Sequence, residues 1–139
     1  MSRLQLDDCV RSSDGPSYQD RPRFLVESDA GAANSCHSDL GRYASPIKIF
    51  EHMAAGLPVI GADIGETRCI IEDEGSGVAV EFSPENFAQA VLGLLGDPAH
   101  YGIHSARAIE FAVRHGWARL LDGEMDFIGQ VQSRECGGH

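Results

Sequence analysis

The stretch that decides the fold spans residues 45–62 and reads S-P-I-K-I-F-E-H-M-A-A-G-L-P-V-I-G-A. Ser45 belongs to the favoured helix N-cap residues, and Pro46 suits the first helical position. Gly56 suits the left-handed residue that closes a helix. The pattern therefore predicts one helix over residues 45–55, with both of its ends fixed by local chemistry.

Helical segments and short Val- and Ile-rich runs alternate on both sides of this helix. We predict strands at 23–28, 58–62 and 77–82, a turn-like segment at 29–41, a helical turn or two at 66–72, a helix that Ser83 caps, a helix at 98–115 and a last helix at 117–131. Helices that separate short buried strands imply βαβ units. We therefore expect an α/β fold with a small parallel sheet flanked by helices.

The two ends of the chain differ in texture from the middle. Residues 1–27 are polar and broken by Pro and Gly, so we leave them unassigned as a loose extension. Residues 132–139 are predicted to form a disordered tail. The total of 139 residues suffices for one domain, which we place at 28–131.

The charge balance and the cysteines bound the class of protein. Eleven basic against 21 acidic residues give a net charge of −10, which disfavours a nucleic-acid surface. The four cysteines are far apart and form no C-x-x-C pair, which fits a reducing compartment. No apolar run is long enough for a membrane-spanning helix. We expect a cytoplasmic protein that binds no nucleic acid.

The predicted helix at 45–55 has two distinct faces at 100° per residue. The sector expected to face the core contains Ile47, Phe50, Met53 and Ala54. Lys48 and Glu51 share a neighbouring polar sector. A helix N-terminus offers unpaired N–H groups and partial positive charge, and Lys48, the only lysine, adds a full charge there.

Glu51 follows Lys48 by about one turn, or roughly 5 Å along the axis. A carboxylate at that step can accept hydrogen bonds from ribose hydroxyls, as an acidic residue does in dinucleotide sites. The spacing therefore suits a nucleoside diphosphate. The open alternative is an ordinary i, i+3 ion pair on an exposed helix, worth about 0.2–0.5 kcal/mol.

At this point the sequence resembles a known family. S-P-I-K-I-F-E-H-M-A-A-G-L-P-V-I, followed by D-I-G-E-T-R-C-I-I-E-D-E-G-S-G-V-A-V-E-F at 63–82, is similar to the C-terminal, donor-binding domain of family-four type glycosyltransferases with the GT-B fold. These enzymes transfer a sugar from a nucleotide diphosphate donor, usually without a metal. The resemblance spans about residues 42–131 and implies a partial Rossmann-like domain that needs neither cofactor nor metal.

The resemblance also implies site residues. Glu51 matches the second glutamate of the family's Glu, seven residues, Glu motif, which contacts the donor ribose; the first falls at Tyr43. In an S-P-x-K version of the motif, the backbone of the first residues and the lysine side chain lie near the diphosphate. The implied donor-binding residues are Ser45, Pro46, Ile47, Lys48 and Glu51. Catalytic residues stay unassigned.

Two parts of the family pattern are absent from this sequence. The upstream Arg and Lys pair has no counterpart, residues 1–27 show no likeness to the family, and the N-terminal acceptor domain is missing. We interpret the chain as a truncated glycosyltransferase that supplies the donor site and is inactive alone. The acceptor, whether glycan, lipid or small molecule, would come with the missing domain. Peripheral membrane association of the complete enzyme stays open, as does the alternative of a non-catalytic remnant or interaction module.

The other polar residues that could form a metal or ligand site give weaker signals. His100 and His104 have the i, i+4 spacing of a helical metal pair, but no third ligand follows at a usual spacing. His52 is expected to pack or lie on the surface. The acidic run at 72–74 is typical of a solvated turn. We therefore predict no metal site.

Overall fold

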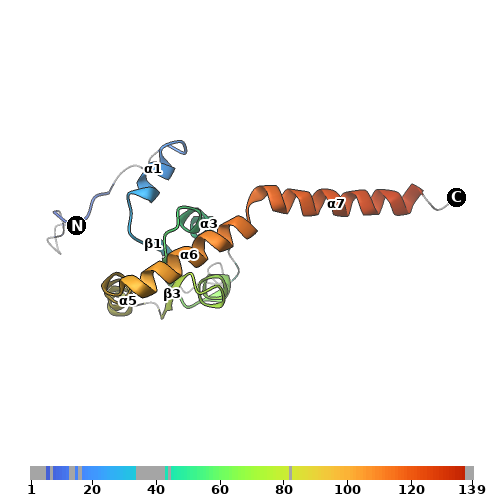
Figure 1. Ribbon diagram of the computed structural model, residues 1–139. Coiled ribbons are helices and arrows are strands. Elements are labelled where there is room, and N and C mark those ends of the chain that lie inside the picture. The colour runs from blue at the N-terminus through green and yellow to red at the C-terminus, as the bar shows by residue number, and fades with distance from the viewer. Residues whose placement is uncertain are drawn as a thin grey trace.

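The computed structural model describes residues 6, 8–12, 15, 17–33, 43, 45–81 and 83–136. A three-stranded parallel sheet in the order β1-β2-β3 forms its centre, and helices flank it (Figure 1). The strands are β1 (Gly31–Ala33), β2 (Val59–Ala62) and β3 (Gly77–Val80). The helices are α1 (Arg21–Val26), α3 (Ile47–Ala54), α4 (Gly65–Arg68), the π-helical segment η2 (Cys69–Asp73), α5 (Pro84–Gly96), α6 (Pro98–Arg114) and α7 (Trp117–Cys136). The predicted α/β class and partial Rossmann-like architecture are confirmed.

The core lies where α3 and α6 meet the sheet. All four residues of the central strand β2 are buried, as expected of a parallel strand covered on both faces. The core cluster consists of Ala33, Ile49, Met53, Val59, Ile70, Ile71, Ala108 and Phe111. It draws on strands, on α3, on η2 and on α6, so these elements form one packed unit.

Helix α3 begins later than the sequence predicted. Pro46, with an extended ψ of 108°, is the N-cap, and the first helical residue is Ile47. No described side chain caps this end, so the predictions of Ser45 as N-cap and Pro46 as first helical residue are wrong by one position. The amide of Ile49 donates to the Pro46 carbonyl at 3.0 Å, which leaves the first N–H groups of the helix free of intrahelical partners.

The other end of α3 confirms the prediction. Gly56 has a φ of +74°, the left-handed conformation that glycine adopts without steric cost. Its amide donates to the Met53 carbonyl at 2.9 Å, and that of Leu57 donates to the His52 carbonyl at 3.0 Å. These two bonds are the Schellman pattern. Ser105 of α6 adds a bond from its hydroxyl to the Gly56 carbonyl at 2.7 Å.

The rotation of α3 differs from the predicted one. Ile49 and Met53 are completely buried, whereas Ile47 is 73% exposed and Ala54 is exposed. Phe50 is half-buried beside the core. The apolar residues of this helix occupy more than one sector, and only contact with the sheet and α6 selects the pair that is buried.

The segment before β1 is helical instead of extended. The predicted strand at 23–28 is wrong, because residues 21–26 form α1 with Pro22 in its first turn. Arg23 and Glu27, one turn apart, form an ion pair at 3.2 Å, which extended backbone would not allow. β1 lies inside the stretch predicted to be turn-like, and residues 34–41 of that stretch lie outside the described residues.

The later elements follow the prediction more closely. Ser83 caps α5 by accepting from the amide of Asn86 at 3.0 Å. β3 ends at Val80, two residues before the predicted end, and residue 82 is not among those described. α7 continues to Cys136, so residues 132–136, predicted to be disordered, are helical. No helix in the described part of the chain is both long and apolar enough to cross a membrane.

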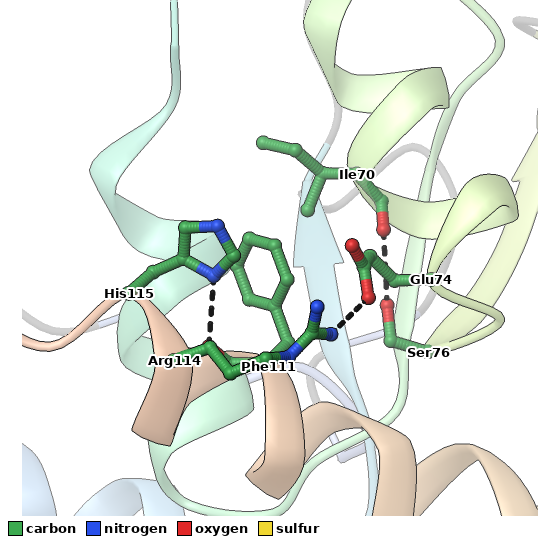
Figure 2. Close-up of polar contacts among 6 residues, drawn as sticks. All are labelled: Ile70, Glu74, Ser76, Phe111, Arg114 and His115. Atoms are coloured by element: carbon green, nitrogen blue, oxygen red, sulfur yellow. Dashed lines mark hydrogen bonds and ion pairs between the residues drawn. The ribbon is translucent and has the colours of Figure 1, made fainter.

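Helix α6 is tied to the turn before β3 at its C-terminal end (Figure 2). The guanidinium of Arg114 donates to the carboxylate of Glu74. The ring of Phe111 stacks on that of His115, with centroids 4.0 Å apart. The Phe50 ring is tilted against the Phe111 ring, and their centroids are 5.5 Å apart. These contacts hold α6 against both α3 and the turn.

The backbones of β2 and β3 approach so closely at Gly77 that we expect only glycine to fit at this position. A Cβ at Gly77 would lie 1.8 Å from the carbonyl oxygen of Val59, whereas one at Gly93 on α5 would meet nothing within 4 Å. We expect Gly77→Ala to lower the free energy of unfolding by about 3 kcal/mol, since backbone must move to admit the methyl group. Gly93→Ala is the matched control and should raise it by up to about 1 kcal/mol. Urea unfolding followed by circular dichroism measures both; equal effects would contradict the register.

Candidate functional site

The N-terminus of α3 lies at the edge of the sheet where ligands bind in open α/β folds. In the order β1-α3-β2 of a parallel unit, the crossover helix begins near the carboxyl end of the first strand. The residues predicted for the diphosphate gather at this end: Ser45, Ile47 and Lys48 are exposed, and Pro46 is half-buried. The structure thus brings together an exposed ammonium group and the uncapped helix N-terminus.

Glu51 lies one turn further along α3, at the rim of an open pocket. The pocket has a volume of about 290 Å³. Its walls are formed by Tyr18, Arg21, Pro22, Leu25, Val26, Glu51, Ala54 and Ala55, and thus by α1, the residues just before it, and α3. Lys48 is not among these residues. The predicted ribose carboxylate therefore lines a mostly apolar pocket, and the predicted diphosphate residues lie outside it.

The carboxylate of Glu51 pairs with Arg21. Arg21 Nη1 lies 3.6 Å from Glu51 Oε1, and the two side chains are 50% and 34% exposed. Among the described residues Lys48 and Glu51 form no ion pair, so the alternative of a simple i, i+3 pair is not what the helix shows. The half-exposed pair with Arg21 is worth no more than about 1 kcal/mol, which a ligand can replace.

Arg21 and Tyr18 are site residues that sequence reasoning missed. The guanidinium carbon of Arg21 lies 5.4 Å from the centre of the Tyr18 ring, within cation–π range. Both residues fall in the segment predicted to be a loose extension, and no local pattern links them to Glu51, thirty or more positions away. Only the packing of α1 beside α3 reveals the contact.

A further cation lies at the carboxyl end of β2. Arg68 Nε contacts Glu72 at 2.9 Å and Asp63, the residue after β2, at 3.3 Å. The hydrogen bond that Arg68 donates to Glu72 and the charge of Asp63 raise the pKa of this guanidinium. Both carboxylates already neutralise Arg68, so it adds little positive potential for a ligand.

The other candidate positions do not join the group of residues around the N-terminus of α3. Thr67, in α4, is fully buried, and its Oγ1 has no hydrogen-bond partner among the described residues. Tyr43, at the family's first glutamate position, is 86% exposed. The rings of His100 and His104 are 6.4 Å apart, and the part of the chain that the structure describes contains no cluster of three potential metal ligands.

Comparison with known proteins decides the family. The model of the family described as "Glycosyl transferases group 1" matches residues 6–97, two thirds of the chain. This chain belongs to the group 1 glycosyltransferases. The matched range contains the exposed N-terminus of α3, Glu51 and the whole sheet. It begins at residue 6, so the expectation that residues 1–27 show no likeness to the family is wrong.

Curated relatives of this group 1 glycosyltransferase chain share one name. A D-inositol 3-phosphate glycosyltransferase of Kineococcus radiotolerans is 26% identical over 141 positions, which cover 94% of this chain and 31% of that protein. One from Saccharomonospora viridis is 29% identical over 131 positions, covering 94% and 29%. One from Thermobispora bispora is 36% identical over 86 positions, covering 58% and 20%. The chain thus spans less than a third of these relatives.

His52 lies between the candidate site on α3 and the core. Its ring packs so closely over the first residue of β1 that a Cβ at Gly31 would lie 2.4 Å from it. Burial lowers the pKa of His52, the charge of Lys48 lowers it further, and Glu51 acts in the opposite direction. Its Nδ1 is buried without a hydrogen-bond partner among the described residues, so the neutral ring is the form the fold favours. The expected packing role fits this position.

The depressed pKa predicts acid sensitivity of folding. Below the ordinary value of 6.5 the unfolded chain takes up a proton at His52 that the folded chain refuses. The contribution of the neutral ring to stability is therefore present above pH 6.5 and is lost as the pH falls from that value towards the folded pKa. Urea midpoints measured above and below pH 6.5 should fall on the acid side.

His52→Phe keeps a ring but cannot titrate, so it should flatten this part of the pH profile. If the variant and the original protein lost stability in parallel over that range, another group would have to be responsible.

Proposed function

We propose that this chain supplies the donor-nucleotide site of a glycosyltransferase that uses a nucleotide diphosphate sugar. The backbone at the start of α3, from Ser45 to Ile47, and the Lys48 ammonium would hold the diphosphate. Pro46 has no N–H, so Ser45 and Ile47 would be the backbone donors of this stretch. Glu51 would accept hydrogen bonds from the ribose hydroxyls. The observation that carries the proposal is the uncapped, exposed end of α3 beside the chain's only lysine, one turn from a carboxylate that lines an open pocket.

The catalytic contribution of such a site is electrostatic. When the sugar leaves, negative charge grows on the departing diphosphate. Backbone N–H groups at a helix N-terminus and an ammonium group stabilise that charge without reorganising. We propose that Lys48 and the first turn of α3 take this role in place of a metal ion. The group that handles the acceptor is not assigned to any residue of this chain.

We propose that the acceptor site lies in a part of the enzyme outside residues 28–131. The chain spans 31% or less of the three relatives compared above, and we propose that residues 28–131 form an incomplete donor-binding domain. We propose that these residues alone do not carry out transfer. The name of the relatives makes a phosphorylated inositol the candidate acceptor for the assembled cytoplasmic enzyme.

Calorimetric titration of the chain with uridine and guanosine diphosphates tests the donor site. We expect at least one of them to bind, and Glu51→Gln to weaken that binding by about tenfold or more, because a charged acceptor of ribose hydrogen bonds is lost. Lys48→Met should weaken diphosphate binding while leaving the bare nucleoside unaffected. Heat equal to that of dilution for both nucleotides would remove the proposal.

The matched control is Glu110→Gln, which makes the same chemical change at an exposed position of α6. It should bind nucleotide as the original chain does. Equal losses for Glu51→Gln and Glu110→Gln would show that net charge, and not the site, sets the affinity.

Arg21 offers a separate test of the pocket. In the free chain its guanidinium pairs with the Glu51 carboxylate, so ribose hydroxyls must compete with Arg21 for that carboxylate. We expect Arg21→Ala to strengthen nucleotide binding by up to about fivefold, the equivalent of the 1 kcal/mol that a half-exposed ion pair can contribute. Arg23→Ala, whose partner is Glu27, is the control and should leave the affinity unchanged. A large loss with Arg21→Ala would instead make Arg21 a direct ligand contact.

The competing function is a non-catalytic module that keeps the fold. The pairing of Glu51 with Arg21 and the tyrosine at the family's first glutamate position favour it. The two proposals differ in the same titration, since a module that has lost donor binding gives no nucleotide-dependent heat in any variant.

A further inference from the structure

His52 lies on α3 between the proposed donor site and the sheet. It directly follows Glu51 and comes one helical turn after Lys48, so both charged residues of the site are its neighbours on the helix. Its ring packs over β1, where a Cβ at Gly31 would lie 2.4 Å from it. This side chain therefore contacts the core strand and is close to both charged groups that we propose for the donor.

The buried Nδ1 of His52 has no hydrogen-bond partner among the described residues. The protonation of such a ring depends on burial, which favours the neutral form, and on the charges nearby. Burial has the largest influence and lowers the pKa of His52, the charge of Glu51 raises it, and the charge of Lys48 lowers it. A change of charge at Glu51 or Lys48 therefore alters the protonation of this ring.

Glu51 and Lys48 are the charged groups that act on His52. Strands β1 and β2, at residues 31–33 and 59–62, contain no titratable side chain. Helix α6 packs on α3 at Gly56 with uncharged side chains, those of Ser105 and Ile109. The titratable side chains of α6 that contact other elements lie against the turn before β3 instead; they are His104, Arg107 and Arg114.

Binding of a donor would change both of these influences in the same direction. A diphosphate beside Lys48 brings negative charge to the place where the ammonium group now lowers the pKa of His52. Ribose hydroxyls that bind Glu51 displace the guanidinium of Arg21, which lies 3.6 Å from that carboxylate in the free chain. Glu51 then acts on the ring without a neutralising partner. Both changes favour the imidazolium form.

We propose that His52 takes up a proton from solvent when a nucleotide diphosphate sugar binds at the tip of α3. The proton adds to the lone pair of the neutral imidazole, and no bond of the donor changes. This inference rests on the proposed donor site and gives that site a dependence on pH. Because binding and protonation are linked, donor affinity rises as the pH falls below the pKa that the ring has with donor bound. A rise of one pH unit in that pKa corresponds to about tenfold tighter binding.

Calorimetric titration with UDP-glucose and GDP-mannose, between about pH 5.5 and 7.5, tests the inference around the ordinary pKa of histidine. These donors have no terminal phosphate group, whose own titration near about pH 6 would obscure that of the ring. Two buffers with different enthalpies of ionisation, neither of them phosphate, reveal the number of protons taken up. We expect net uptake on binding, and an affinity about threefold or more higher at the acid end of the range.

His52→Phe and His52→Gln remove the titrating group in two different ways, one with an aromatic ring and one with an amide. Both variants should bind donor without proton uptake and with an affinity that varies less with pH. His100→Phe is the matched control, since it makes the same change at an exposed position of α6. It should keep the uptake of the original chain. Circular dichroism at each pH checks that all variants are folded.

Nuclear magnetic resonance of the original chain keeps the test decisive if the His52 variants fold poorly. Among the six histidine rings, one should titrate with a midpoint below 6.5 in the free chain and at a higher pH with UDP-glucose or GDP-mannose bound. Donor binding that moves no such midpoint, or proton uptake that both His52 variants retain, would overturn the inference and leave the donor site standing. No binding of either donor at any pH would remove the donor site, and this inference with it.

Discussion

The burial of Ile49 and Met53 against the sheet is the constraint on which the rest of the site depends. Both side chains are completely removed from solvent, and each such burial contributes about 1.5–3 kcal/mol. The ion pair between Arg21 and Glu51 is half-exposed and contributes no more than about 1 kcal/mol. Packing, and not charge, therefore sets the rotation of α3. With that rotation fixed, Lys48 faces solvent and Glu51 faces α1.

The two ends of α3 are held very differently, and this difference gives the helix its potential as a binding element. Its C-terminal end is closed by Gly56, which also accepts a bond from Ser105 of α6. No described side chain caps its N-terminal end, and Ile47, the first helical residue, is exposed. A rigid base and an open, partly positive tip are what a preorganised anion site needs, because no donor has to move when the ligand arrives.

Local charge and net charge oppose one another in this chain. A body with a net charge of −10 repels a diphosphate at long range, yet the field near a ligand is set by the groups within a Debye length, about 8 Å at physiological salt. At the tip of α3 these include Lys48 and the amide groups of the first turn, together with the carboxylate of Glu51 one turn away, which pairs with Arg21. Arg68 is neutralised by Asp63 and Glu72. Because this chain belongs to the group 1 glycosyltransferases, we propose the tip of α3 as its donor-nucleotide site.

The sequence by itself determined what local chemistry fixes: the end of α3 at Gly56, the strands that begin near residues 58 and 77, the Ser83 cap and the motif that carries the family likeness. It did not determine that residues 21–26 are helical, which side of α3 is buried, or that Arg21 contacts Glu51. Short segments have nearly equal helix and strand preferences, and a helix with apolar residues on several sides has no preferred face. Only contacts between residues distant in the sequence decide between such alternatives, and these exist in the tertiary structure alone.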